Sequence, residues 1–242
     1  MSENNYGGFF DSPGQIKEPI EKKAYVQERA TLAEDIRKLY WLNIANLIIT
    51  VLTNDTLAEL LPFISGLASI AGIVCSIVTL VIFFRMGNII DEYRTAAYCT
   101  IASVVVSIVG VIVGVIAEIS FGGGAALVVI VAIISAIVSV YASYKEFQGH
   151  VTILSGIDDE LAEKWNTLWN WTMFAAGTAI LGLLLMFLLV TLAAVVMLIG
   201  GIVAIVAIVL RVKYMKEMAD LFEELAIKCE IAIKEAAEAE EE

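Results

Sequence analysis

Ionisable side chains are absent from the long apolar runs of this chain. No Asp, Glu, Lys, Arg or His occurs in residues 39–54, 60–84, 95–117, 119–144 and 165–210. Because 60% of the residues are hydrophobic, a soluble fold would expose apolar patches far larger than those of soluble monomers, which measure roughly a few hundred Å². Uncharged runs of this length are suited to lipid. The composition therefore excludes an ordinary soluble domain and indicates an integral membrane protein.

Histidine and cysteine are too scarce to suggest a catalytic or metal site. His150 is the only histidine, and the acids that follow it lie on a charged linker. The three cysteines, Cys75, Cys99 and Cys229, have neither zinc-site spacing nor an even number. No nucleophile–base pair, phosphate-binding loop or zinc motif can be assembled. We therefore expect no catalytic, cofactor-binding or metal-binding residue and no cofactor, and a membrane-embedded enzyme is the least favoured function.

Basic residues are missing from one side of the topology that the apolar runs predict. All 15 Lys and Arg residues fall in the segments 1–38, 85–94, 145–170 and 211–242. The loops on the other side hold Asp55, Glu59 and Glu118 but no base. Because Lys and Arg accumulate in cytoplasmic loops, this distribution predicts an even number of spans with both termini in the cytoplasm.

The apolar runs predict an all-α, polytopic integral membrane helix bundle. A helical span needs about 20 apolar residues. We predict six spans, arranged as three hairpins, at about 39–53, 61–84, 95–117, 123–144, 171–190 and 192–212. The first span is short, which tilt or local thinning of the bilayer would accommodate. The last two come from one overlong run that we divide near Thr191, although no Gly, Pro or Asn marks a turn there.

The segments outside the predicted membrane domain, 39–212, carry helical patterns of their own. Residues 1–38 are predicted to form a cytoplasmic segment with an amphipathic helix, and Thr31–Glu34 matches a capping box. Residues 213–242 are predicted to form a cytoplasmic acidic amphipathic helix and tail. Its apolar seam recurs about every three to four residues and consists of Met215, Met218, Phe222 and Leu225.

This seam has three possible roles that the spacing does not separate. It could pack on the N-terminal helix, pair with a second copy of the chain, or bind a cytoplasmic protein partner. The acidic C-terminal end, Glu238–Glu242, argues against nucleic acid as a partner, because phosphates repel it.

Small and polar residues form stripes along the predicted spans. Ser107, Gly110 and Gly114 are predicted helix-packing residues, because small side chains let membrane helices approach closely. Asn43 and Asn46 are the strongest polar pair within the predicted spans. An interhelical hydrogen bond is the favoured interpretation of this pair, and lining a substrate site is the alternative.

Residues 144–165 are the most distinctive stretch, beginning Tyr144-Lys145-Glu146-Phe147-Gln148-Gly149-His150 and ending at Lys164-Trp165. The stretch resembles a segment of small, uncharacterised multi-pass membrane proteins of bacteria, some of which also share an Arg-Lys-Leu-Tyr-Trp motif, here Arg37–Trp41. Some of those proteins carry an N-terminal zinc ribbon, whereas this chain has no cysteine there. The resemblance implies a bacterial inner-membrane location and no known activity.

Two functions are compatible with these features. The first is a non-enzymatic scaffold or regulatory subunit of the cell membrane, whose cytoplasmic segments bind a protein partner or a second copy. The alternative is a small channel or transporter that uses the polar faces of spans one to four. Both functions require the lipid bilayer as a partner.

Overall fold

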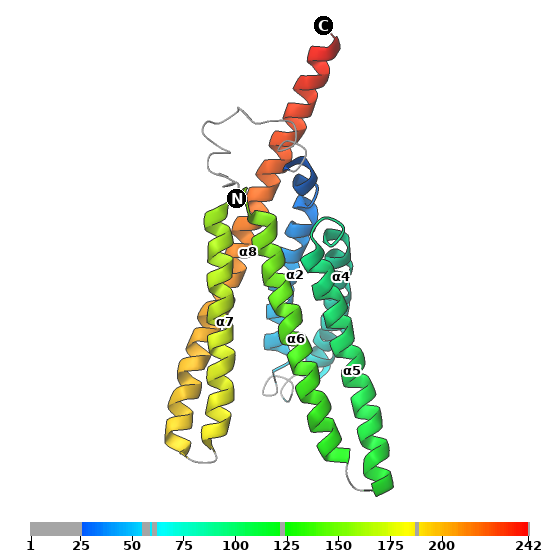
Figure 1. Cartoon of the computed structure of the whole chain (residues 1–242), viewed down its shortest axis with the longest axis vertical. Helices are drawn as coiled ribbons and strands as arrows, with labels where there is room; N and C mark the ends of the chain where they lie inside the picture. The colour runs from blue at the N-terminus through cyan, green and yellow to red at the C-terminus, as the bar shows by residue number, and fades with distance from the viewer. Residues whose placement is uncertain (1–25, 55–58, 60–61, 122–123, 187–188, 242) are drawn as a thin grey trace, which may run out of the picture. The chain divides into compact units, whose positions relative to one another are not determined.

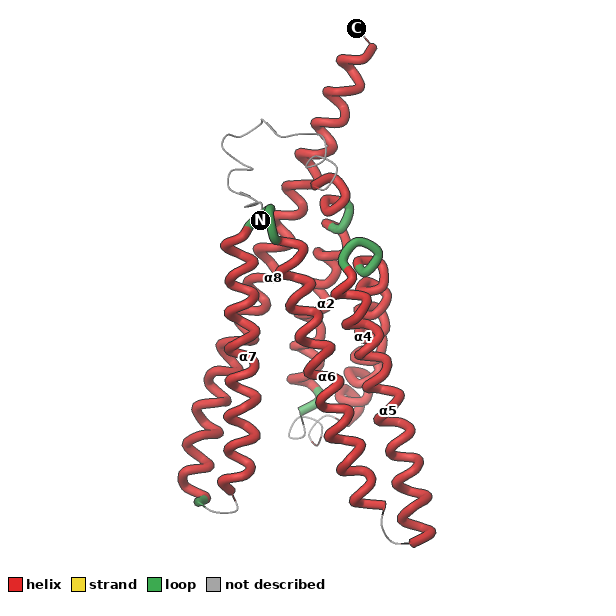
Figure 2. The backbone as a smooth tube through the Cα atoms, in the orientation of Figure 1, coloured by secondary structure: helices red, strands yellow, loops and turns green. Residues whose placement is uncertain are grey.

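The described part of the chain is built from α-helices. The computed structural model describes residues 26–54, 59, 62–121, 124–186 and 189–241. Every regular element in these ranges is helical (Figures 1 and 2). The helices are α2 (Ala33–Leu52), α4 (Pro62–Met86), α5 (Asp91–Phe121), α6 (Gly124–Leu154), α7 (Asp159–Met186) and α8 (Val190–Glu241). The all-α prediction is confirmed for these residues.

Four of the helices, α4, α5, α6 and α8, are long and apolar enough to cross a membrane. Two of them continue well beyond the predicted spans into charged sequence: α6 runs on to Leu154, and α8 extends to Glu241 as one helix of 52 residues. At 1.5 Å per residue, α8 is about 78 Å long. A single rigid element therefore joins the last apolar run to the acidic C-terminal segment.

The chain divides into two compact units. Unit 1 comprises Met1–Thr79 and Val151–Glu242, and unit 2 comprises Leu80–His150. Unit 2 thus contains the end of α4, the whole of α5, and α6 as far as His150.

In unit 1, α7 packs along α8, and α2 packs on α8 (Figure 1). Small residues set the distance between α7 and α8. A Cβ added to Gly200 would lie 2.2 Å from Thr178 Oγ1, and one added to Gly182 would lie 2.3 Å from Met197 Cγ. Only glycine permits the two backbones to approach this closely. Such close approach is typical of membrane helices, which dispersion contacts hold together.

The predicted turn at Thr191 is displaced. Helix α7 ends at Met186 and α8 begins at Val190, so Thr191 lies in the first turn of α8. The run has no Gly, Pro or Asn between Leu183 and Thr191. Hydropathy alone therefore could not indicate at which residue the turn between α7 and α8 falls.

The predicted capping box at Thr31–Glu34 does not form. Leu32 occupies the N-cap of α2 in a helical conformation, with no side-chain cap, and Thr31 Oγ1 donates instead to Glu28 O at 2.6 Å. Residues 26–30 are already helical. The chain therefore enters α2 through a tight turn between two helical segments, where the extended N-cap geometry that a capping box needs is missing.

The connection from α6 to α7 is a well-defined helix-to-helix turn. Gly156 has a φ of 76°, the left-handed conformation that glycine adopts without strain after a helix C-terminus. Asp158 then accepts a hydrogen bond from the Leu161 amide at 2.9 Å, as an N-cap residue does. Glycine and aspartate thus end one helix and start the next within a few residues.

Candidate functional site

Large buried side chains concentrate where the helices carry charged sequence. In unit 1 these are Ile36, Ile153, Leu154, Trp165, Leu168, Met215, Met218 and Phe222, and in unit 2 they include Met86, Tyr93 and His150. By contrast, isoleucines in the middle of the apolar helices, such as Ile73, Ile137 and Ile205, are more than half exposed. The charged ends therefore have cores like those of soluble proteins, and we take them as the candidate functional region.

The apolar seam of α8 is part of the core of unit 1. Met215, Met218 and Phe222 are fully buried, Leu225 is 3% exposed, and α2 packs on α8. Arg37 of α2 pairs with Glu223 beside the seam. Of the three roles that the spacing left open, packing inside the chain is the one observed. The four side chains are buried within the chain in this structure and offer little surface to a separate protein.

Helix α7 covers another part of the same core. Trp165 is fully buried, and its ring lies 6.1 Å from that of Tyr214 at an interplanar angle of 65°. This edge-to-face geometry is favourable for aromatic pairs. The distinctive stretch that ends at Trp165 therefore contributes a central core residue of unit 1.

Arg29 joins the N-terminal segment to the end of α6. Its side chain is 5% exposed, and Nη1 donates to Ile153 O at 2.7 Å and to Ser155 O at 2.9 Å. The last carbonyls of a helix lack partners within the helix and carry partial negative charge. The Arg29 guanidinium donates hydrogen bonds to these carbonyls, and its positive charge balances their partial negative charge. Sequence reasoning missed this role, because Arg29 resembles any other charged residue of an amphipathic segment.

In unit 2, a polar cluster is buried between α5 and α6. His150 is 1% exposed, and its Nδ1 lies 2.8 Å from the Tyr93 hydroxyl. Its Nε2 lies 3.7 Å from Glu146 Oε1, one turn earlier on α6. The sequence pattern shows no convergent partners for His150. The contact with Tyr93 is not evident from it, because the two residues are 57 positions apart in the chain.

Serine hydroxyls connect α5 to α6 farther along unit 2. Ser103 is hydrogen-bonded to Ser135 at 2.8 Å and to Ser139 at 2.7 Å, and Ser107 is bonded to Ser135 at 2.7 Å. Because these hydroxyls bond to one another across the helix pair, they hold the helices together. Their bonding gives no support to a polar pore.

The two predicted packing glycines lie in the same contact. A Cβ on Gly110 would lie 2.0 Å from Val131 Cγ1, and a Cβ on Gly114 would lie 2.3 Å from Val128 Cγ2. At the far end of this hairpin, the Glu118 carboxylate accepts a hydrogen bond from the Gly124 amide at 2.9 Å. A carboxylate at a helix N-terminus is favourable.

The asparagine pair in α2 makes no interhelical hydrogen bond in the part of the chain that the structure describes. Asn43 Nδ2 donates to Leu39 O of the same helix at 2.9 Å, and Asn46 accepts from Thr50 through its backbone carbonyl at 2.8 Å. The interhelical bond stays a prediction. A local carbonyl one turn earlier satisfies the Asn43 amide without help from a neighbouring helix.

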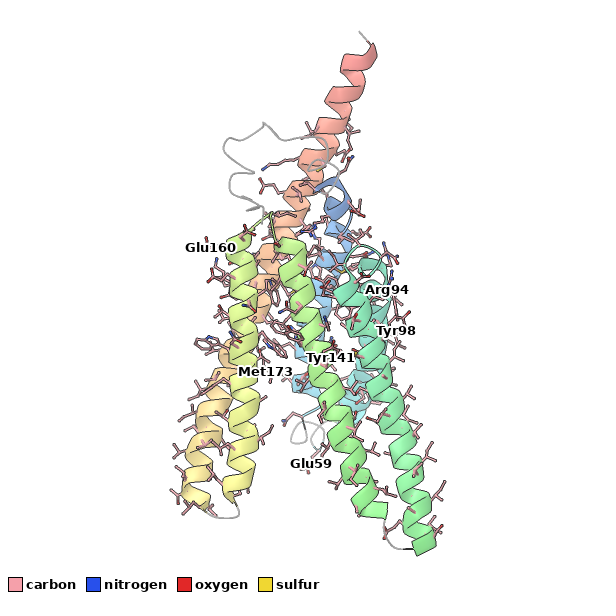
Figure 3. All side chains as sticks on the ribbon, in the orientation of Figure 1. Glu59, Arg94, Tyr98, Tyr141, Glu160 and Met173 are labelled. Atoms are coloured by element: carbon pink, nitrogen blue, oxygen red, sulfur yellow. The ribbon has the colours of Figure 1, made fainter. Side chains whose placement is uncertain are left out.

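Several charged pairs on the surface lie within single helices, unlike the Arg37–Glu223 pair between α2 and α8. At the start of α7, labelled at Glu160 in Figure 3, Lys164 Nζ lies 2.8 Å from Glu160 Oε1. The hydrogen bond lowers the pKa of Glu160 and raises the pKa of Lys164. Burial raises the pKa of the Cys229 thiol, which leaves it less reactive. Among the described residues, no group of three His, Cys, Asp or Glu is placed to hold a metal ion.

No family model, no curated protein and no solved structure matches this chain.

Proposed function

We propose that this chain is a multi-pass protein of the cell membrane that acts as a non-enzymatic scaffold or regulatory subunit. The observation that supports this function is the location of the large buried side chains. They form compact cores at the charged ends of the helices, whereas the apolar stretches leave most of their side chains exposed. Such stretches are suited to lipid, and an organised core outside them is suited to holding a cytoplasmic surface in a defined shape.

Six spans with both termini in the cytoplasm are part of the proposal. Four helices have the length and composition of spans. Helix α7 packs along α8, and α2 packs on α8, so a bilayer that surrounds α8 also surrounds its neighbours. Counting α2 and α7 as spans keeps every Lys and Arg on one side, which agrees with the positive-inside rule.

The partner-binding role is assigned to the end of α8, beyond the buried seam. Leu225 is the last buried residue of the described side chains on this helix, and Ile227, Ile231 and Ile233 are each more than half exposed. Residues 226–242 carry more acids than bases. We expect this segment to bind either a partner with a basic, partly apolar surface or a second copy of the chain.

Truncation after Leu225 tests the function without removing core residues. The full chain and the chain lacking 226–242 would be cross-linked in intact cells, and the products identified by mass spectrometry. We expect a specific cytoplasmic partner, or a cross-linked homo-oligomer, in the full chain only, with equal thermal stability of both proteins in detergent.

Identical cross-linking patterns from the two equally stable proteins would contradict the scaffold proposal. The double substitution Ile227→Ser and Ile231→Ser is the matched variant, since it keeps the helix length and the charges. Solute flux into proteoliposomes that is lost on Asn43→Leu would favour the channel or transporter alternative instead.

A further inference from the structure

In unit 2, a basic residue and a tyrosine lie one turn apart near the charged end of both α5 and α6. Helix α5 starts at its charged end, and Arg94 precedes Tyr98; α6 runs toward its charged end, and Tyr141 precedes Lys145 (Figure 3). At 1.5 Å per residue, each tyrosine lies about 6 Å nearer the apolar run than its base. Phenol rings prefer the membrane interface, and bases prefer the charged headgroups above it. Each pair therefore has the order of groups that a phospholipid requires.

The ammonium group of Lys145 lies beside an aromatic ring instead of a carboxylate. Its Nζ is 6.0 Å from the centroid of the Tyr141 ring. The one acid of α6, Glu146, is turned toward His150, with Oε1 3.7 Å from Nε2. Five other lysines each lie within 3.6 Å of a glutamate one turn away on their own helix: Lys38, Lys164, Lys213, Lys228 and Lys234. The charge of Lys145 is thus placed to attract an anion.

The turn between α4 and α5 positions Arg94. A Cβ added to Gly87 would lie 2.7 Å from Arg94 Cβ, so the turn packs directly on the stem of this side chain. Nη2 donates to Asn88 Oδ1 at 3.0 Å. The nearby Asp91 carboxylate is 3.8 Å from Nη1 and 91% exposed, and water weakens such a pair. The guanidinium has five N–H donors in a fork that fits phosphate oxygens, and Asn88 occupies one of them.

The surface beside each pair is apolar in the direction of the membrane. Tyr98 is 60% exposed and Tyr141 is 47% exposed. Exposed apolar side chains continue the same helical face at intervals of three and four residues, namely Ile101 and Val105 on α5 and Ile137 and Ile134 on α6. A molecule that covers such a face must be apolar along its length and negatively charged at one end. A soluble anion would reach only the base, whereas an anionic phospholipid covers the whole face.

We propose that unit 2 binds anionic phospholipids of the cytoplasmic leaflet at the pairs Arg94–Tyr98 and Tyr141–Lys145. The base binds the lipid phosphate, the phenol lies beside the glycerol and carbonyl groups, and the apolar face contacts the acyl chains. The surface charge of anionic lipids attracts bases at this depth. The inference rests on the membrane location and orientation proposed above, and it is independent of partner binding by α8.

Native mass spectrometry of the full chain in a non-ionic detergent tests the proposal. The chain would be titrated with phosphatidylglycerol and with phosphatidylcholine of the same acyl chains, and the bound lipids counted. Both lipids carry a phosphate, but only phosphatidylglycerol has a net negative charge. We expect phosphatidylglycerol to bind more tightly. Arg94→Gln and Lys145→Gln should each weaken its binding at one site about fivefold, leave phosphatidylcholine binding unchanged, and together abolish the preference.

Matched variants separate specific sites from a general effect of charge. Lys228→Gln combined with Lys234→Gln removes two charges that are already paired with glutamates, and this variant should keep the preference. Lys145→Arg should keep it as well, because the positive charge remains.

Equal affinity of the unaltered chain for the two lipids would overturn the proposal without recourse to any variant. A preference that survives the double substitution Arg94→Gln and Lys145→Gln would overturn it too. Inorganic phosphate that displaces phosphatidylglycerol more effectively than sodium chloride of equal ionic strength would assign the bases to a soluble anion instead. Binding of neither lipid would contradict the membrane location itself, whereas the truncation of α8 tests the scaffold function separately.

Discussion

At the scale of single residues, glycine and serine determine how closely the helices approach. The stripe Ser107, Gly110 and Gly114 was recognisable from its spacing, because small residues at such intervals are typical of membrane helix contacts. The structure adds the partner: Val131 and Val128 of α6 fill the space that the two glycines leave. The role of Arg29 had no such local signal, since the carbonyls that it binds lie more than a hundred residues away.

Gly110→Ala is expected to destabilise the contact between α5 and α6. The new Cβ would lie 2.0 Å from Val131 Cγ1, and a β-branched valine cannot rotate away without cost. Overpacking of this kind costs about 1–3 kcal/mol. Reversible unfolding of the purified protein in mixed micelles would measure the change. Gly66→Ala is the control, because its Cβ meets nothing within 4 Å, and equal effects of the two substitutions would refute the packing explanation.

Arg29→Met is expected to loosen the end of α6 and the turn after it. The substitution keeps an apolar stem but removes two charge-assisted hydrogen bonds, each worth about 1.5–3 kcal/mol. Hydrogen exchange of residues 151–157 would report the loss. Arg37→Met serves as the comparison, since its ion pair with Glu223 is about half exposed and such pairs contribute about 0–1 kcal/mol. An equal loss of protection from hydrogen exchange in both variants would show that the two hydrogen bonds of Arg29 do not stabilise this turn.

At the scale of elements, α8 is the organising helix of unit 1. It packs along α7 and against α2. The seam from Met215 to Leu225 was predictable as an apolar stripe. Its partner was not, because a spacing of three and four residues serves an internal core and an external interface equally well.

Phe222→Ala is expected to destabilise unit 1 by about 3–5 kcal/mol, as removal of a buried aromatic ring does elsewhere. Its side chain is fully buried, whereas Ile227 on the same helix is 54% exposed. Thermal unfolding and limited trypsin digestion at Lys213 and Lys216 would reveal the change. Ile227→Ala should behave like the unchanged protein, and a seam used only by an external partner would leave both variants equally stable.

The ion pair that begins α7 should show a defined pH dependence. Because the folded pKa of Glu160 is lowered from 4.5, its contribution is present above about that pH and is lost as the pH falls through the lower folded value. The pKa of Lys164 is raised from 10.5, so its share is complete below that pH and is lost as the pH rises through the higher folded value. Carboxyl ¹³C NMR would follow Glu160, and Lys164→Gln should return its midpoint to the ordinary range. An unchanged midpoint would rule out the hydrogen bond as the cause.

At the scale of the whole molecule, the charge distribution divides the chain into two kinds of surface. Charged sequence and large buried side chains occur in the same segments, and the apolar segments between them have few large buried side chains. This separation is the physical basis for expecting a membrane domain with functional parts at one face.

Single cysteines introduced into a chain without Cys75, Cys99 and Cys229 would test the topology. A membrane-impermeant maleimide should label intact cells at Glu59→Cys and Ser120→Cys, and should label Ser155→Cys and Lys213→Cys only after permeabilisation. The reason is that all Lys and Arg lie in segments predicted to remain in the cytoplasm. Labelling of the first pair only after permeabilisation would reverse or break the six-span topology.

The amino-acid sequence was sufficient to predict long apolar helices. Length, hydropathy and charge are local quantities, so uncharged runs between basic segments were enough to predict an all-α membrane protein. The burial of the seam, the bond of Asn43 to its own helix and the contact of Arg29 with the end of α6 became apparent only from the folded chain. The pairing of Tyr93 with His150 belongs to the same group. Each of these depends on which of several compatible surfaces come together, and that choice follows from the packing of residues far apart in the chain.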